Sequence, residues 1–190
     1  MWILVPLGNP GETYTATRHN LGRLMLQRWM ADHRPEPRLL HPFRSGALYG
    51  LGDPYLSLVP GTYMNHSGQT VAEAVAAGFE PGRMILLADD KDLPLGLGRF
   101  RPSGGDGGHN GLRSVHAHLG GDAIARLRLG IGPYERPLAD FVLGEWTDAE
   151  WDRIEALDEP FGRFMTLLGQ IDDPTELMGK VNAQAFWNNV

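Results

Sequence analysis

Two histidines and one aspartate are the side chains in this sequence best suited to moving a proton: His19, Asp89 and His109. Imidazole has an ordinary pKa of about 6.5, so it can accept a proton near neutral pH. A carboxylate bonded to its second nitrogen fixes the tautomer and stabilises the imidazolium. Side-chain amides can hold a water molecule, orient a peptide-like substrate or stabilise an oxyanion. Three asparagines are candidates for supplying such amides: Asn9, Asn65 and Asn110.

These residues include no obvious covalent nucleophile. The sequence has no G-x-S-x-G motif, and Ser67, which precedes Gly68, lacks that context. A His–Asp pair without a nucleophile indicates a water molecule activated for attack on an electrophile. The alternative is a zinc site built from both histidines and the aspartate, but no H-x-x-x-H or comparable spacing supports it. We expect neither a metal nor another cofactor.

The stretch from Asp89 to Arg113, DDKDLPLGLGRFRPSGGDGGHNGLR, contains several of these groups. Its clustered glycines allow the backbone to turn tightly or to approach a ligand closely, because glycine has no Cβ. The segment NGLRSVHAHL predicts a helix, so His109 and Asn110 are expected at a helix N-terminus, where unpaired N–H groups attract negative charge. A flexible surface loop is the alternative, and two arginines just upstream favour a site.

The charges are unevenly distributed along the chain. The net charge is −6, but residues 99–136 contain six arginines and three acidic residues, a net +3. Residues 137–190 contain eleven acidic residues and three basic ones, a net −8. Electrostatic attraction is screened beyond about 8–10 Å, so a local basic patch can bind phosphate on an acidic protein. Arginines scattered over unrelated faces are the alternative.

Strands and helices alternate along the chain, and their arrangement must position these groups. Apolar runs predict strands at residues 2–7, 48–51, 55–59, 84–88 and 124–131, the second and third forming a hairpin and the last half-exposed. Helical patterns occur at residues 21–29, 69–77 and 110–119. This order predicts an α/β fold of three layers, in which helices flank a mixed, mostly parallel, twisted sheet. We expect one domain over residues 1–190, with an acidic, mostly helical tail at 147–190 that is interrupted at Pro160 and Pro174.

Several of the candidate groups follow predicted strands. Asn9, Asn65 and Asp89 each come after one, and His19 lies at the start of a helical pattern, where we expect it to be partly exposed. If these strands are parallel neighbours, their ends bring the polar groups to one edge of the sheet. Asn65 could instead cap the helix that follows it, which for a single residue is the commoner role.

The composition excludes several classes of protein. The sequence has no cysteine, which rules out disulfides, thiolate metal sites and a cysteine nucleophile. The first residues, MWILVPLG, lack the pattern of a signal peptide, and no stretch approaches the roughly 20 apolar residues of a membrane span. We therefore expect a cytoplasmic protein without a membrane partner. A nucleotide-binding domain is not supported, because neither G-x-G-x-x-G nor a P-loop follows the first strand.

Six ordered blocks resemble the bacterial peptidyl-tRNA hydrolases: LGNPGETYTATRHNLG, PGTYMNHSG, DDKDLPLG, GGDGGHNGLRS, RLRLGIG and DFVLGEW. They extend from about Val5 to Trp146. The resemblance implies a monomeric α/β protein that needs no metal and binds peptidyl-tRNA. It implies hydrolysis of the ester that joins the peptide to the 3′ end of tRNA. A non-catalytic RNA-binding relative is the alternative, although both His19 and Asp89 are present.

The same resemblance implies a role for each matching residue. His19, from TRHN, is the general base that activates water, and Asp89 is its partner. His109 and Asn110 position the water or the substrate. Asn65 and Asn9 bind the peptidyl and terminal-nucleotide end of the substrate. The remaining matches are Tyr14 and Met64, which form walls of the cleft, and Arg101 and Arg128, which face tRNA phosphate.

Three residues depart from the family pattern. Pro6 replaces a common glycine, and Ala88 replaces an expected histidine before the acidic pair. Asp106 replaces a neutral or basic residue in the glycine-rich stretch, which is expected to weaken phosphate attraction there. None of the three removes a proposed catalytic group.

Overall fold

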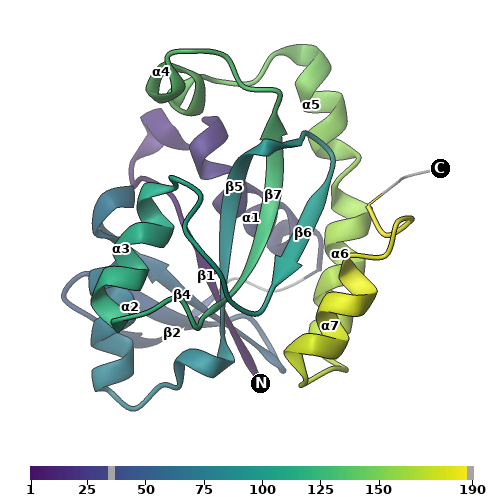
Figure 1. Ribbon diagram of the computed structural model, residues 1–190. Coiled ribbons are helices and arrows are strands. Elements are labelled where there is room, and N and C mark those ends of the chain that lie inside the picture. Colours follow the sequence, from purple (N-terminus) through teal and green to yellow (C-terminus); the bar gives the residue numbers. More distant parts are fainter. Residues whose placement is uncertain (34–36, 188–190) are drawn as a thin grey trace.

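The computed structural model describes residues 1–33 and 37–187, and within these residues one seven-stranded mixed sheet forms the centre of the molecule (Figure 1). The strand order is β2-β3-β4-β1-β5-β7-β6, and the four strands from β4 to β7 in this order run parallel. The pairs β2–β3, β3–β4 and β6–β7 are antiparallel. The strands are β1 (Trp2–Pro6), β2 (Arg38–Pro42), β3 (Gly46–Gly50), β4 (Tyr55–Pro60), β5 (Met84–Pro94), β6 (Gly98–Arg101) and β7 (Ala125–Gly132).

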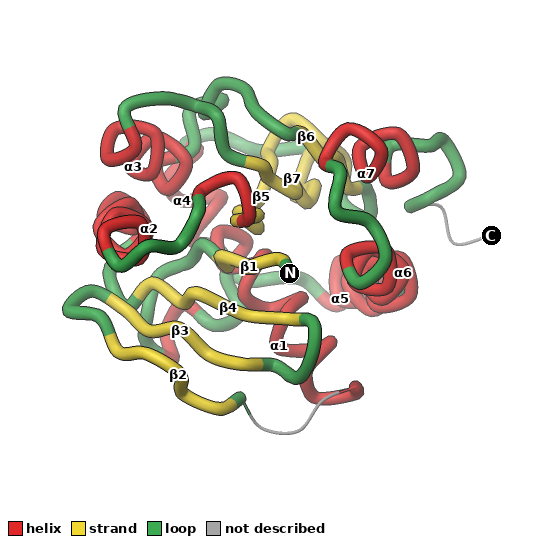
Figure 2. Tube along the Cα trace, turned by 90° about the horizontal axis from the view of Figure 1, so that it is seen from below, coloured by secondary structure: helices red, strands yellow, loops and turns green. Residues whose placement is uncertain are grey.

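Helices cover both faces of this sheet (Figure 2), which confirms the predicted α/β class. Helices α2 and α3 lie on one face, and α1, α5 and α6 lie on the other. The helices are α1 (Leu21–His33), α2 (Ser67–Ala76), α3 (Asn110–Leu119), α4 (Leu138–Leu143), α5 (Asp148–Glu155), α6 (Asp158–Leu168) and α7 (Pro174–Val181). The 3₁₀ turns are η1 (Glu12–Tyr14), η2 (Arg18–Asn20), η3 (Met64–His66) and η4 (Pro81–Arg83).

The central strands are apolar on both sides because both faces of the sheet are covered. In β1, Ile3 and Val5 belong to the core under α2 and α3, whereas Trp2 and Leu4 belong to the core under α1 and α6. This alternation follows from the two-residue period of side chains along a strand. It explains why the predicted strand at the start of the chain reads as an uninterrupted apolar run.

Two sequence predictions about strands were wrong. β5 does not end at Ala88 but continues to Pro94, because the backbones of Asp89 and Asp90 pair with β7. β7 is not half-exposed but buried along most of its length, because Leu127 and Leu129 belong to the core and Arg126, on the opposite face, is covered by the glycine-rich loop, to whose Gly105 carbonyl it donates. Strands β2 and β6 were not predicted, whereas the β3–β4 hairpin is confirmed.

The acidic segment from Thr147 is helical, as predicted, but Pro160 does not interrupt it. Pro160 lies in the first turn of α6, and Pro174 is the first residue of α7. Proline is tolerated in the first turn of a helix, where its missing N–H would have no intrahelical partner. None of the helices in the described ranges combines the length and apolar character that crossing a membrane requires.

Candidate active site

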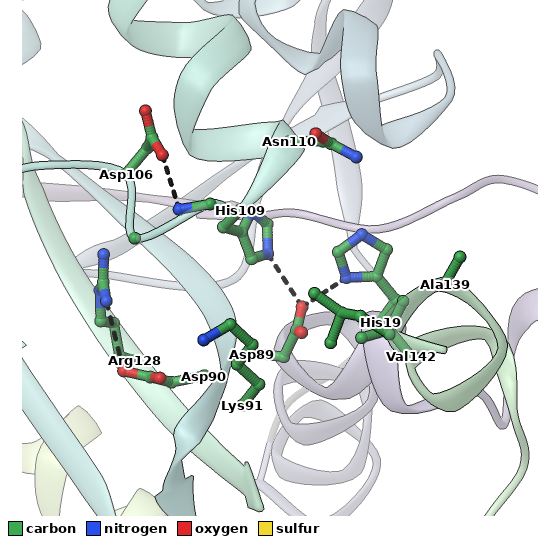
Figure 3. A pocket seen from close by; sticks show the side chains of 13 residues that line it. His19, Asp89, Asp90, Lys91, Asp106, His109, Asn110, Arg128, Ala139 and Val142 are labelled. Atoms are coloured by element: carbon green, nitrogen blue, oxygen red, sulfur yellow. Dashed lines mark hydrogen bonds and ion pairs between the residues drawn. The ribbon is translucent and has the colours of Figure 1, made fainter. Parts of the chain in front are cut away.

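His19 and Asp89, which are 70 residues apart in the sequence, meet at the carboxyl-terminal edge of the central strands. The turn η2 places His19 just before α1, and β5 supplies Asp89. The Nδ1 atom of His19 lies 2.7 Å from Oδ1 of Asp89 (Figure 3). The expectation that His19 is partly exposed was wrong, since only 8% of the residue is accessible and 5% of Asp89.

His109 binds the same carboxylate oxygen. Its Nε2 atom lies 2.9 Å from Oδ1 of Asp89, while its Nδ1 accepts hydrogen bonds from the backbone N–H groups of Gly111 and Leu112 at 3.1 and 3.2 Å. Since Nδ1 is an acceptor, the proton is on Nε2, and neutral His109 donates to Asp89. His109 therefore caps α3, as its predicted position at a helix start allows. Its pairing with Asp89 was not predicted from the sequence.

The pKa values of the pair favour a charged carboxylate beside a basic imidazole. Burial disfavours the imidazolium of His19, but the charge and hydrogen bond of Asp89 outweigh burial and raise the pKa of His19. Burial also disfavours the carboxylate of Asp89, but its interactions with His19 and His109 hold the pKa of Asp89 well below its usual range. Both shifts follow from the close contact of the two groups, since an opposite charge nearby favours the charged form of each.

A cavity of about 160 Å³ opens beside this pair. Five predicted site residues line it: His19, Asp89, His109, Asn110 and Arg128. Helix α4 forms another wall through Leu138, Ala139 and Val142, and Figure 3 shows the last two beside His19. Sequence reasoning missed this wall, because a six-residue helix gives too short a periodic pattern to identify.

The predicted residues Asn9, Tyr14, Met64 and Asn65 form a second group outside the lining of this cavity. The Oδ1 atom of Asn9 accepts the backbone N–H of Met64 at 2.7 Å. The side chain of Asn20 fixes the Asn9 backbone, accepting from its N–H at 2.8 Å and donating to its carbonyl at 2.9 Å. Asn20 was also missed, although it is the last residue of the TRHN motif.

The other members of the second group lie along the same loops. The ring of Tyr14 packs edge-on against Tyr63, with centroids 6.1 Å apart. Met64 is buried, whereas Asn65 is exposed and its Nδ2 lies 3.4 Å from Nε2 of His66. The interpretation of Asn65 as a helix cap was wrong, because the residue at the cap of α2 is His66.

Arginines from β6 and β7 share one face of the sheet edge. Arg101 is the cross-strand partner of Arg126, and Arg99 is the partner of Arg128. Directly opposed residues of antiparallel strands point to the same side, so these four side chains are not scattered over unrelated faces. Arg101 is exposed, whereas Arg128 donates to Asp90 at 3.3 Å and to the Gly105 carbonyl at 2.8 Å.

The sequence profile of the peptidyl-tRNA hydrolases, described as "Peptidyl-tRNA hydrolase", matches residues 3–188. The chain belongs to the peptidyl-tRNA hydrolase family. The resemblance inferred from six sequence blocks is therefore confirmed. A peptidyl-tRNA hydrolase from Gloeobacter violaceus is 42% identical over 163 residues, covering 82% of this chain and 81% of the relative. One from Methylocella silvestris is 39% identical over 182 residues, covering 91% and 90%.

Solved structures of this family have the same fold. The crystal structure of peptidyl-tRNA hydrolase from Acinetobacter baumannii superposes with a TM-score of 0.83 and 31% sequence identity, covering 96% of this chain and 95% of that one. A crystal structure of a peptidyl-tRNA hydrolase complex with N-propanol gives the same TM-score at 30% identity and the same coverage.

Asp106, one of the departures from the family pattern, shapes the glycine-rich loop. Its Oδ1 atom accepts the backbone N–H of Gly108 at 2.7 Å, and this bond lowers the pKa of Asp106. Gly107 and Gly108 both have positive φ, 60° and 82°, which glycine adopts without strain. The side chain of Asp106 therefore closes the loop that leads into His109. From the sequence, this residue was expected only to weaken the attraction of phosphate.

The His–Asp–His cluster has the residue types of a metal site, and its three ligand atoms lie within 4.8 Å of one another. Zinc ligands about 2.0–2.1 Å from the metal in a tetrahedron lie about 3.3 Å apart. The His19–Asp89 and His109–Asp89 distances of 2.7 and 2.9 Å are those of hydrogen bonds. Moreover, Nε2 of His109 carries a proton and has no lone pair for a metal. As arranged, both histidines are hydrogen-bonded to Asp89.

Proposed function

We propose that this member of the peptidyl-tRNA hydrolase family cleaves the ester between a peptide and the 3′ end of tRNA with a water molecule activated by His19 and Asp89. The observation that most directly supports this proposal is the 2.7 Å hydrogen bond between His19 Nδ1 and Asp89. It leaves Nε2 of the same ring as the proton acceptor, on the side of the ring away from Asp89 (Figure 3). A neutral imidazole in this tautomer is the arrangement that a general base needs.

The proposed reaction is a hydrolysis in which His19 moves one proton. His19 Nε2 takes a proton from water as the water oxygen attacks the carbonyl carbon of the ester. The bond between that carbon and the 3′ oxygen of the terminal ribose breaks, and the imidazolium returns its proton to this oxygen. The products are free tRNA and a peptide with a new carboxyl group, which ionises by releasing the second proton of the water to solvent. The charge of Asp89 stabilises the imidazolium between the two transfers.

The remaining site residues are assigned to substrate binding in this proposal. Asn110 lines the cavity together with His19 and positions water or the ester. Asn9 and Asn65 bind the peptidyl and terminal-nucleotide end, beside walls formed by Tyr14 and Met64. Arg101 and Arg128 face tRNA phosphate. We further propose that residues 1–190 act as one domain, as a monomer and in the cytoplasm.

The deciding experiment incubates purified protein with a peptidyl-tRNA ester, with and without a chelator, and measures release of free tRNA. We expect cleavage at the same rate in both conditions, because the proposed step uses the protein's own imidazole. The control is His19→Ala, checked for an unchanged melting temperature. Binding of the substrate without cleavage would support the non-catalytic RNA-binding alternative. Loss of activity with chelator would contradict the metal-free step.

A further inference from the structure

The side chain next to His19 points away from the cavity and into the segment around α4 and α5. Arg18 is largely buried, with 11% of its side chain exposed. Its Nη2 atom donates to both carboxylate oxygens of Glu150, at 3.0 and 2.8 Å. Its Nη1 atom lies 3.4 Å from the carbonyl oxygen of Phe141, in α4. The turn that presents His19 is therefore bonded to residues more than 120 positions later in the chain.

Further contacts fix this arginine between aromatic rings and the backbone. Its guanidinium carbon lies 4.7 Å from the centre of the Phe141 ring and 5.2 Å from that of Trp146. The backbone N–H of Arg18 donates to the Gly144 carbonyl at 3.1 Å. A Cβ on Gly144 would lie 2.8 Å from Arg18 Nη1, so the glycine leaves room for the guanidinium.

The carboxylate that receives Arg18 is itself held in place. Glu150 forms a capping box with Thr147, accepting the backbone N–H of Thr147 at 2.8 Å and its hydroxyl at 3.0 Å. Although burial opposes it, these bonds and Arg18 lower the pKa of Glu150. The acceptor is thus charged and held at the first turn of α5 by its own capping box as well as by Arg18.

Helix α4 contacts Arg18 through the carbonyl oxygen of Phe141 and forms the apolar wall of the cavity. The wall residues Leu138, Ala139 and Val142 share the cavity with His19 and Asp89. Figure 1 shows α4 next to the N-terminal segment that carries η2, and the two are in contact. Arg18 therefore joins the turn that carries His19 to α4, through the Phe141 carbonyl, and to α5, through Glu150.

We propose that Arg18, together with Glu150, is a positioning residue that holds α4 against the His19–Asp89 pair. The proposal rests on the proposed function, since it assigns Arg18 to the same hydrolysis. Arg18 touches neither the reacting atoms nor Asp89. It acts through the placement of His19 and of the wall that limits water around it. Misplacement of a catalytic group by about 1 Å can cost on the order of 100-fold in rate.

The test compares Arg18→Ala and Glu150→Gln with Arg28→Ala as a matched control. Arg28 makes a similar two-atom pair with Asp158, joining α1 to α6 away from the cavity. Two readouts are kcat and KM for peptidyl-tRNA. A third is the rate of His19 modification by diethyl pyrocarbonate, measured by mass spectrometry against exposed His66.

For Arg18→Ala we expect a fall in kcat on the order of 10–100-fold with KM changed less than about threefold. We also expect faster modification of His19 at an unchanged rate for His66, a smaller effect in Glu150→Gln, and partial recovery in Arg18→Lys. Arg28→Ala should change neither kcat nor His19 modification. Equal effects of the Arg18 and Arg28 variants, or unchanged His19 modification in Glu150→Gln, would overturn the proposal. If wild-type protein cleaves no peptidyl-tRNA, the proposed function fails, whereas the modification rates still test the positioning.

Discussion

The Oδ1 atom of Asp89 is hydrogen-bonded to Nδ1 of His19 at 2.7 Å. Both residues are almost fully buried. The same oxygen also accepts the N–H of His109 at 2.9 Å. Two imidazoles on one oxygen hold Asp89 ionised and fix its rotamer, because hydrogen bonds to a charged form favour that form. The pair therefore has a defined tautomer and orientation before any substrate is bound.

Removing the proposed base, His19, is the most direct test of this relationship. His19→Ala should lower kcat by about 10²–10⁴, the usual contribution of general base catalysis. Asp89→Asn should lower kcat while substrate affinity stays near normal, because the asparagine disturbs only the tautomer and charge balance of His19. Single-turnover rates and substrate binding are measured for both. Near-normal turnover in His19→Ala would remove it from the mechanism, and collapsed affinity in Asp89→Asn would make Asp89 a structural residue.

The pH dependence of kcat/KM should report the raised pKa of His19. The base must be neutral, so activity is lost as pH falls through this pKa, and the limb should lie above the ordinary 6.5. In Asp89→Asn the burial that lowers the pKa remains, whereas the charge that raises it is gone. The limb of this variant should therefore move to lower pH. A limb at the same pH in both proteins would show that another group is titrating.

His109 both caps α3 and donates to Asp89, and substitution can separate these two roles. Asparagine is a good helix cap but is too short to reach Asp89 in the same way, so His109→Asn should keep the melting temperature and lose activity. His109→Ala should lose both, with stability falling by about 0.5–2 kcal/mol for the missing cap. Thermal unfolding and kcat are compared in the two variants. Full activity in His109→Asn would show that the bond to Asp89 is dispensable.

Much of the site could be predicted because its polar residues interrupt apolar patterns. The glycines before His109 and the helical pattern after it placed this residue at a helix N-terminus, and the structure agrees. Asp89 follows five apolar residues, so its place near a sheet edge could be predicted, although β5 continues past it. Both positions could be predicted because each depends only on the residues immediately before and after it.

The rest depends on contacts between distant segments, which local patterns do not encode. His19 is buried by residues of β5 and α4, which are distant from it in the sequence. Asp89 binds His109, which lies in a loop 20 residues further along the chain. Arg128 illustrates the same limit. The strand that carries it was predicted to be half-exposed, but the guanidinium of Arg128 donates to the Gly105 carbonyl of the glycine-rich loop and to Asp90.

The two arginines assigned to tRNA phosphate should now behave differently. Arg101 is exposed, so Arg101→Ala should raise KM for full-length peptidyl-tRNA and spare truncated esters. The slope of the logarithm of the binding constant against the logarithm of salt concentration should also become shallower, by about 0.7–0.9 for each phosphate that the protein no longer neutralises. KM is measured over a salt series with both substrates. Equal losses on both substrates would contradict a phosphate role for Arg101.

Arg128→Ala has an additional consequence, because it removes one hydrogen-bond donor from Asp90 and one from the Gly105 carbonyl, leaving Asp92 N–H and Arg126 as their remaining donors. We expect a loss on truncated esters as well as on full-length substrate, since the loop that leads to His109 loses one of the hydrogen bonds that hold it. Arg128→Lys, which keeps the charge but not the planar fork, should recover the salt dependence more than the rate. Identical behaviour of the Arg101 and Arg128 variants would contradict this distinction.

The close approach of α3 to the loop after β4 leaves no room for a side chain at position 111 unless Met64 moves. A Cβ there would lie 2.5 Å from Sδ of Met64 and 3.0 Å from Cε1 of His109. Alanine normally stabilises a helix by about 0.5–1 kcal/mol relative to glycine, so Gly111→Ala should reverse the usual sign and lower the melting temperature. Gly179→Ala in α7 is the matched control, because no atom lies within 4 Å of its added Cβ, and it should raise the melting temperature. The clash should also displace His109 and reduce kcat, whereas the control keeps full activity. If Gly111→Ala stabilised the protein as the control does, Met64 would not be packed against the helix that His109 caps.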